Sequence, residues 1–262
     1  MLAPYRATPE IHVLPGYFPI PTLGIIPSNA FVIEAEEPVL VDTGLAPLQA
    51  EFQEALRSVI DPADLRWLWL AHTDQDHLGS LGWLLDENPD LRVVTTFIGV
   101  GKMSLYAPLP LERCYWLNPG ESLPVGDREL LAIKPPSFDA PETTGLYDPA
   151  SGALLTADCL GALMSEPAQE AGDIEPKHLE EGLMLWATID TPWLHQVDAG
   201  SFASTIEGLR ALEPEVVLSS HLPAAPGMAD ELFGMLEQVP ACEPWVGPGQ
   251  PVLAEILAGA GG

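Results

Sequence analysis

The chain has 262 residues, 47% of them hydrophobic, which is long and apolar enough to bury a substantial core. Its 38 acidic residues against 10 lysines and arginines give a formal net charge of −28. Such a surface repels phosphate backbones and anionic lipids, so neither nucleic acid nor a membrane is expected as a partner. The acidity is explained either by solubility alone or, as the less common case, by a cationic or neutral substrate.

Three features of the sequence bear on the compartment. No uninterrupted apolar run reaches the length of about 18 residues that a membrane-spanning helix needs. The first residues lack the basic stretch and apolar run of a secretory signal. Three scattered cysteines, Cys114, Cys159 and Cys242, form no CxxC pair and no disulfide framework. We therefore expect a protein of the reducing cytoplasm.

Short strands alternate with helical segments in the first part of the chain. Pro47 opens a segment whose apolar residues recur at helical spacing, and residues 65–70 form an apolar run typical of a buried strand. A turn at Pro38 separates two further apolar runs. The elements predicted up to residue 96 are strands at 28–34, 39–41, 65–70 and 91–96, and helices at 47–59 and 79–85.

The second part of the chain predicts more strands and two amphipathic helices. Residues 162–197 are looser in pattern and acidic, which fits either helical pieces over a sheet or a cover facing a substrate. The tail 244–262 is rich in Gly and Pro and is expected to be mostly irregular. No repeat or break in composition divides residues 1–262, so one α/β domain is expected. The predicted elements are strands at 130–133, 145–147, 153–157 and 216–218, and helices at 203–212 and 229–236.

The run His72-Thr73-Asp74-Gln75-Asp76-His77 directly follows the predicted buried strand at 65–70. In extended or turning backbone, residues two apart point the same way, so His72, Asp74 and Asp76 can converge. His77 points elsewhere and can serve a second ion. Four such side chains so close together need a cation or shared protons. The alternative is a solvated polar loop, against which the buried strand argues.

This run resembles the His-x-His-x-Asp-His signature of the metallo-β-lactamase superfamily. Three other segments resemble parts of that family in the same order, and the resemblance extends from about Asn29 to Pro223. It implies an α/β protein with the αββα sandwich, in which two mixed β-sheets pack face to face with helices outside. The three segments are 29–44 with its Asp42-Thr43-Gly44 turn, 145–161 leading to Asp158, and 217–221 ending at His221.

The resemblance also implies two metal sites that share one carboxylate. Two ions about 3.5–4 Å apart, bridged by a carboxylate and a hydroxide, are the usual arrangement for such a pair. Carried over by position, the first site would hold His72, Asp74 and Asp158, and the second would hold Asp76, His77, His221 and the shared Asp158.

Two positions depart from the signature. Its middle histidine is Asp74 here, and the later histidine of the superfamily is missing, with Asp139 in its place. If Asp139 binds, the first site has one imidazole and three carboxylates, a set that favours iron or manganese over zinc. If Asp139 does not bind, the first site is weak and the protein could work with one ion. One or two divalent or trivalent metal ions are thus the expected cofactors.

Three functions are compatible with such a centre. The first is a metal-dependent hydrolase, in which a metal-bound hydroxide attacks an ester, lactone, thioester or amide of a small molecule. Asp76 would bind one ion and orient this hydroxide, as its counterpart does in family hydrolases. The second is a di-iron protein that binds or reduces O2 or NO. The third is a metal-binding module without turnover, which a fold alone does not exclude.

The di-iron alternative rests on a second resemblance. The flavodi-iron proteins and their oxygen-sensing relatives are similar in placing a carboxylate, usually Glu, at the position of Asp74. They keep the histidine that Asp139 replaces, so the match is partial. No flavodoxin-like or rubredoxin-like segment follows, and a reductase would therefore need a separate electron donor. A homodimer is compatible with the sequence.

Other residues allow two interpretations. Cys159 is either a soft ligand or a small buried hydrophobe, and Tyr147 either donates to a reacting oxygen or belongs to the core. His195 either lines the substrate cleft or is packed or exposed elsewhere. His12 and His178 are expected at the surface, and Trp67, Trp69 and Trp83 in the core. The loops that would select the substrate are expected within 99–119 and 167–197.

Overall fold

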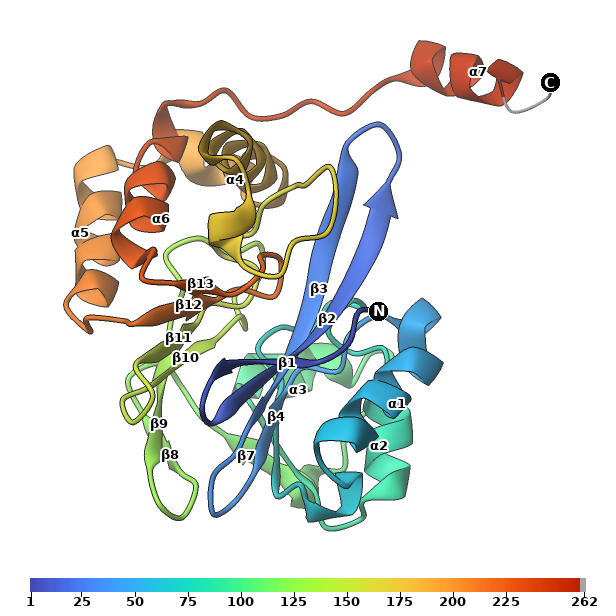
Figure 1. Ribbon diagram of the computed structural model, residues 1–262, viewed down its shortest axis with the longest axis vertical. Helices are drawn as coiled ribbons and strands as arrows, with labels where there is room; N and C mark the ends of the chain where they lie inside the picture. The colour runs from blue at the N-terminus through green and yellow to red at the C-terminus, as the bar shows by residue number, and fades with distance from the viewer. Residues whose placement is uncertain (260–262) are drawn as a thin grey trace.

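The computed structural model describes residues 1–259, in which two β-sheets face each other between layers of helices (Figure 1). The first sheet has the strand order β1-β2-β3-β4-β5-β6-β7. Its neighbours from β1 to β4 are antiparallel, and those from β4 to β7 are parallel. The strands are β1 (Tyr5–Thr8), β2 (Ile11–Ile20), β3 (Gly24–Ile33), β4 (Val39–Val41), β5 (Trp67–Trp69), β6 (Arg92–Thr95) and β7 (Cys114–Trp116).

The second sheet has the order β13-β12-β11-β10-β9-β8, with β11 and β12 parallel and the other neighbours antiparallel. Both sheets are therefore mixed, and the expected αββα sandwich is confirmed. The strands are β8 (Ser122–Pro124), β9 (Glu129–Ile133), β10 (Gly145–Asp148), β11 (Ala153–Leu155), β12 (Val216–Leu218) and β13 (Ala225–Pro226).

Strands buried on both faces hold the two sheets together. In β4, Val39 and Val41 face the space between the sheets, and Leu40 belongs to the core under the helices of the first sheet. In β12, Val217 likewise points outward, between two residues of the central core. Because side chains alternate along a strand, both faces must be apolar where both are covered. The tryptophans Trp67 and Trp69 of β5 lie in the central core, as expected.

Helices cover the outer face of each sheet. Those over the first sheet are α1 (Gln49–Val59), α2 (Leu81–Glu87) and α3 (Phe97–Met103), and those over the second are α4 (Pro176–Asp190), α5 (Ala199–Arg210) and α6 (Ala229–Leu236). Short 3₁₀ helices are η1 (Ala46–Leu48), η2 (Pro62–Asp64), η3 (Leu111–Arg113), η4 (Ala171–Asp173), η5 (Pro192–Gln196) and η6 (Val239–Ala241).

The expectation of a mostly irregular tail is wrong for most of its described part. Residues 250–259 form α7 (Gln250–Gly259), which Figure 1 shows standing apart from the sheets at the end of an extended connection. All three prolines of the tail lie in 244–251, and the good helix formers Leu253, Ala254, Glu255 and Leu257 follow them. The last three residues of the predicted tail lie outside the described part of the chain.

The looser acidic segment carries helix α4 at 176–190, which packs Leu179, Leu183 and Ala187 on the second sheet's outer core. Among the helices of the described residues, none combines the length and apolar character needed to cross a bilayer.

Candidate metal centre

The loop from His72 to His77 begins where two parallel strands of the first sheet end. Strands β4 and β5 are neighbours; Asp42 comes directly after β4, and His72 comes shortly after β5. The amide of Asp42 donates to the carbonyl of Trp69 at 2.9 Å, and the amide of Thr43 donates to the carbonyl of His77 at 2.7 Å. Backbone hydrogen bonds thus fix this loop at the carboxyl edge of the sheet, where α/β proteins commonly place their functional groups.

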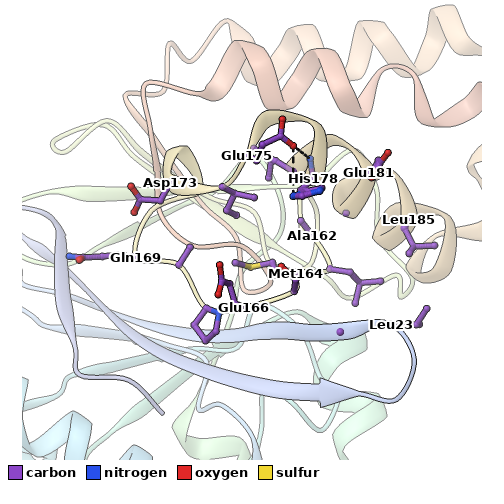
Figure 2. A pocket seen from close by; sticks show the side chains of 18 residues that line it. Leu23, Ala162, Met164, Glu166, Gln169, Asp173, Glu175, His178, Glu181 and Leu185 are labelled. Atoms are coloured by element: carbon purple, nitrogen blue, oxygen red, sulfur yellow. Dashed lines mark hydrogen bonds and ion pairs between the residues drawn. The ribbon is translucent and has the colours of Figure 1, made fainter.

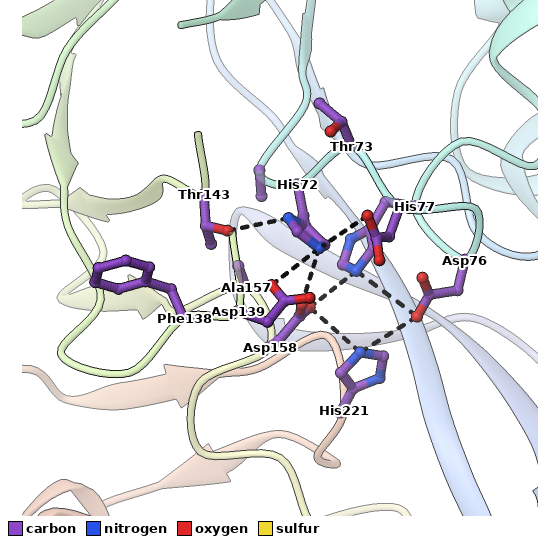
Figure 3. Close-up of polar contacts among 12 residues, drawn as sticks. His72, Thr73, Asp76, His77, Phe138, Asp139, Thr143, Ala157, Asp158 and His221 are labelled. Atoms are coloured by element: carbon purple, nitrogen blue, oxygen red, sulfur yellow. Dashed lines mark hydrogen bonds and ion pairs between the residues drawn. The ribbon is translucent and has the colours of Figure 1, made fainter. Parts of the chain in front are cut away.

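The second sheet delivers its own ligand residues to the same place. Asp158 follows β11, His221 follows the parallel neighbour β12, and Asp139 lies in the loop between β9 and β10. The amide of Thr144 donates to the carbonyl of Ala71 at 2.8 Å and so joins the two sheets beside the cluster. Figure 3 shows the side chains from both sheets converging on one point.

One group of ligand atoms contains two imidazoles and two carboxylates. Asp76, His77 and His221 each offer an atom within 4.8 Å of the others. The Asp76 carboxylate lies 3.4 Å from Nε2 of His221 and 3.7 Å from Nε2 of His77. Oδ1 of Asp158 lies 2.8 Å from the His77 nitrogen and 3.2 Å from the His221 nitrogen. The residues predicted for the second site are therefore together.

A neighbouring group contains one imidazole and at least two carboxylates. His72, Asp139 and Asp158 also offer atoms within 4.8 Å of one another. Nε2 of His72 lies 3.3 Å from Asp139 and 3.5 Å from Oδ2 of Asp158, so the two oxygens of Asp158 face different groups. Asp74 reaches within 3.5 Å of the same nitrogen but is half exposed and lies at the edge of the group.

Each of the three histidines presents Nε2 to the cluster because its Nδ1 has a partner behind it. Nδ1 of His77 donates to Oδ2 of Asp42 at 2.8 Å, and Nδ1 of His221 donates to the Pro27 carbonyl at 2.6 Å. Nδ1 of His72 lies 3.0 Å from the hydroxyl oxygen of Thr143. Such outer partners fix the tautomer and the ring orientation of metal-binding histidines.

The buried polar atoms of the cluster fit a cation. Nε2 of His77 and Oδ1 of Asp158 are buried and lie 2.8 Å apart, without hydrogen-bond geometry to each other or to another atom of residues 1–259. Buried polar atoms are almost always paired, and a metal ion between them would satisfy both. The donor set, with imidazoles and carboxylates only, is suited to iron, manganese or zinc.

Protons balance the charges of this cluster when no metal is bound. Burial alone lowers the pKa of His72, but its hydrogen bonds to Asp139 and Asp74 and the charge of Asp158 outweigh burial and raise that pKa to about 10. For Asp158, burial favours the neutral acid, yet the nearby His77 and His221 hold its pKa well below the usual range. Metal binding must therefore displace protons from the imidazoles.

Asp42 is a functional residue that the sequence marked only as part of a structural turn. It is fully buried, has a φ of 60°, and accepts a hydrogen bond from the amide of Ala71 at 2.8 Å besides the one from His77. The signal in the sequence was a carboxylate directly after the apolar run 39–41, because a carboxylate that becomes buried there needs a compensating partner. The sequence held no signal for Trp186, whose indole donates to the Asp158 carbonyl at 3.0 Å beside the His221 ring.

We expect Asp42→Asn to weaken the second site by about 10- to 100-fold, the range typical of changes behind a metal-bound histidine. Asparagine tolerates the positive φ and keeps an oxygen for the Ala71 amide. Its NH2 group would donate to Nδ1 of His77 and leave the proton on Nε2, the atom that faces the metal. Metal titration of Asp42→Asn against the exposed control Asp86→Asn tests this, and equal affinities would contradict it.

Cys159 and Tyr147, for which the sequence allowed two interpretations each, lie outside the cluster of ligand atoms. Cys159 is buried in the core under α4 to α6, accepts a hydrogen bond from the hydroxyl of Ser137, and has its pKa raised by burial to about 11. Its position agrees with the small hydrophobe and not with a metal ligand. The hydroxyl of Tyr147 donates to the carbonyl of Leu212 at 2.8 Å, so it is not directed at the ligands.

The remaining histidines are also remote from the ligand groups. His195 and His178 are exposed, and the ring of His195 contacts the carbonyl of Pro192. His12 is partly buried and pairs with Glu34 at 2.9 Å.

Two hollows border the centre and its neighbourhood. A cleft of about 440 Å³ ends on Asp74 and Asp76 and is lined mostly by apolar side chains, among them Phe18, Ile26 and Leu45. A larger cavity of about 750 Å³ lies between the β2–β3 turn and α4, within the acidic segment, and touches none of the ligands (Figure 2). Of these two hollows, the smaller cleft is the one that reaches residues of the candidate metal centre.

Comparison with known proteins identifies the family. Residues 26–218 match the model described as "ODP family beta lactamase". The chain is 30% identical over 134 residues to diflavin flavoprotein A 1 of Synechocystis sp., covering 51% of this chain and 23% of the relative. It is 26% identical over 167 residues to the anaerobic nitric oxide reductase flavorubredoxin of Salmonella typhi, covering 63% of this chain and 35% of the relative.

Two solved structures show the same fold. Rubredoxin oxygen:oxidoreductase from Desulfovibrio gigas superposes with a TM-score of 0.76 at 20% identity, over 90% of this chain and 60% of its own. The flavodiiron protein from Giardia intestinalis gives a TM-score of 0.77 at 15% identity, over 92% of this chain and 60% of its own. The chain thus spans about a quarter to a third of these curated relatives and 60% of these solved chains.

These comparisons correct the first functional prediction. The resemblance to the metallo-β-lactamase superfamily and its flavodi-iron branch is confirmed, but the hydrolase is wrong. The relatives reported above are named as flavoproteins, an oxygen oxidoreductase and a nitric oxide reductase. The signal for the redox branch was the carboxylate at Asp74, but Asp139 in place of that branch's histidine made the resemblance partial. None of these names points to zinc or manganese.

Proposed function

The chain belongs to the ODP family of beta-lactamase-fold proteins, and on that premise we propose that it is the di-iron part of an O2 or NO reductase. The observation that carries the proposal is the pair of ligand groups joined by Asp158, whose two oxygens face opposite groups. A shared carboxylate places two ions close enough to act on one small molecule. The relatives named for oxygen and nitric oxide chemistry support the same function.

We assign the ligands of the two ions by group. The first iron would be held by His72, Asp139 and Asp158, with Asp74 at its edge. The second would be held by Asp76, His77, His221 and the other oxygen of Asp158. Iron accepts such oxygen-rich and imidazole ligands in both its ferrous and its ferric state. When bound, the pair supplies electrons to O2 or NO.

The cleft that ends on Asp74 and Asp76 suits a small uncharged substrate. Its wall is largely apolar, with Phe18, Ile26 and Leu45 beside the two carboxylates. A net charge of −28 neither attracts nor repels a neutral diatomic molecule, whereas it would exclude most anions. Because reduction consumes electrons that ordinary side chains do not supply, the proposal includes a separate electron donor.

Anaerobic loading of the full chain with ferrous iron tests the proposal. We expect two iron ions per chain by elemental analysis, and consumption of O2 or NO when a chemical reductant is supplied. Asp158→Ala, treated in the same way, is the control for iron bound elsewhere. A wild-type chain that holds two iron ions and consumes neither gas would overturn the proposal, as would a chain that takes up no iron.

A further inference from the structure

Helix α3 and the turn after it contact the ligand loop from outside the cluster. The ammonium group of Lys102, in the last turn of α3, is hydrogen-bonded to Oε1 of Glu142 and lies 3.8 Å from Oδ1 of Asp74. The hydroxyl of Tyr106 donates to the carbonyl of Thr73 at 2.6 Å. Two contacts thus tie this segment to the residues directly after His72.

Glu142 is a buried carboxylate that forms an ion pair with Lys102. Only 2% of the residue is exposed, and Oε1 accepts hydrogen bonds from the hydroxyl of Thr73 at 2.7 Å and from Lys102. Burial alone would raise the pKa of Glu142, but these two bonds outweigh it and lower the pKa below its usual value. Lys102 itself is about one-third exposed, but its removal would leave the buried Glu142 carboxylate without a compensating cation, which the surrounding structure must relieve by moving.

Two threonines next to this ion pair, Thr73 and Thr143, connect it to the first group of ligands. Thr73, which donates to Glu142, lies between His72 and Asp74 in the chain. Thr143, which follows Glu142, holds Nδ1 of the His72 ring at 3.0 Å. A shift of the Glu142 carboxylate would therefore move the chain at Thr73, between His72 and Asp74, together with the His72 ring. Within residues 1–259, no contact of this kind links the pair to His77 or His221, whose Nδ1 atoms donate to Asp42 and Pro27.

We propose that Lys102 and Glu142 are positioning residues for the first metal ion, and that neither is a ligand. Glu142 holds Thr73 by a hydrogen bond and the His72 ring through Thr143, while Lys102 holds the Glu142 carboxylate in place and lies beside Asp74 at the edge of the first group. The second metal ion does not depend on the pair. This inference rests on the paired metal site of the proposed function but not on its redox chemistry.

Zinc, which undergoes no redox reaction, is the probe for the test. The full chain and its variants are stripped of metal, titrated with zinc, and the affinity and number of bound ions are measured. We expect two ions in the wild type and a loss of affinity at one site only, by about 10- to 100-fold, in Lys102→Met. Lys102→Arg should recover most of this loss, because it restores the charge opposite Glu142.

Lys177→Met is the matched control, since it removes the same charge from an exposed pair with Glu181. Glu142→Gln keeps the shape of the side chain and should weaken the same single site if Lys102→Met fails to fold. Unchanged affinity at both sites in Lys102→Met and Glu142→Gln would overturn the inference. Equal weakening of both sites, or no recovery in Lys102→Arg, would also overturn it, because the pair would then act on the fold as a whole.

The outcome is separable from that of the proposed function. A wild type that binds two zinc ions, and two iron ions without consuming O2 or NO, would overturn the redox proposal and leave this inference standing. A wild type that binds a single ion would overturn both.

Discussion

Asp158→Ala is expected to remove both metal ions from the protein. Oδ1 of Asp158 faces His77 and His221 at 2.8 and 3.2 Å, and Oδ2 faces His72 at 3.5 Å. The substitution therefore removes a ligand from each group at once. Changes behind a ligand already cost about 10- to 100-fold in affinity, so losing a shared ligand should cost more than ~100-fold at both sites. Elemental analysis after loading measures the effect.

Asp139→Ala is the informative contrast to this change. Among the histidines of residues 1–259, Asp139 pairs with His72 alone, at 3.3 Å, and it belongs to the first group only, so its loss should empty the first site and leave the second occupied. Asp86→Ala, at an exposed position of α2, is the control for removing a surface charge. Two ions retained in Asp158→Ala would refute the shared ligand, and two ions retained in Asp139→Ala would refute the composition of the first group.

Gly79→Ala is expected to destabilise the fold by about 3 kcal/mol or more, through a mechanism unrelated to metal. A Cβ atom at Gly79 would lie 2.2 Å from the amide nitrogen of Ala46, 2.3 Å from the carbonyl carbon of Leu45 and 2.5 Å from the carbonyl oxygen of Gly44. All three are backbone atoms, and the Gly79 amide donates to the carbonyl of Gly44 at 2.7 Å. The segments of Gly79 and of residues 44–46 therefore cannot move apart without breaking this hydrogen bond. The melting temperature should fall by about 6–12 °C.

Gly82→Ala, three residues further on, is the matched control. Gly82 is exposed in α2, and an added Cβ would meet no atom within 4 Å. Because alanine favours helix over glycine by about 0.5–1 kcal/mol, this variant should melt at the same temperature or slightly higher. Equal melting temperatures for Gly79→Ala and the wild type would contradict the prediction, because the loop at Gly79 and the loop at 44–46 would then move apart without loss of stability.

Much of the sandwich could be predicted because its strands are short, apolar and separated by clear turns. The predicted strand 216–218 and helix 229–236 coincide with β12 and α6. Strand β2 was missed because it contains Pro15, Gly16 and Pro19, which normally exclude a strand. The structure explains their presence, since β1 pairs only with 11–13 and leaves the rest of β2 at the edge of the sheet, where a missing N–H costs little.

Helix α4 shows a different limit. Its buried residues Leu179, Leu183 and Ala187 recur at helical spacing, and Pro176 stands at its first turn. The many acidic side chains between them obscured this pattern, since they are consistent with both an exposed helix face and an irregular loop. Only the packing of α4 on the second sheet decides between them.

The metal centre was predictable where the chemistry is local. His72 to His77 are neighbours in sequence, and the candidate ligands Asp158 and His221 follow strands β11 and β12 in the order that the resemblance implied. The pairing of Lys102 with Glu142 joins residues from distant segments of the chain, and periodicity carries no signal for such a contact. The direction of the chemistry had one local signal, the carboxylate at Asp74 that resembles the flavodi-iron branch, but Asp139 in place of that branch's histidine made the match partial.

The delivery of ligands by both sheets constrains the order in which the protein is assembled. The second group needs His221 beside His77, and the first needs Asp158 beside His72. Forming either group therefore brings together residues that are far apart in the chain, which costs loop-closure entropy. The central core between the sheets contains none of these ligands and can close before any ion binds. During synthesis, neither site is complete until the ribosome has passed its last ligand, and incorporation of metal becomes a late event on a chain that has already collapsed.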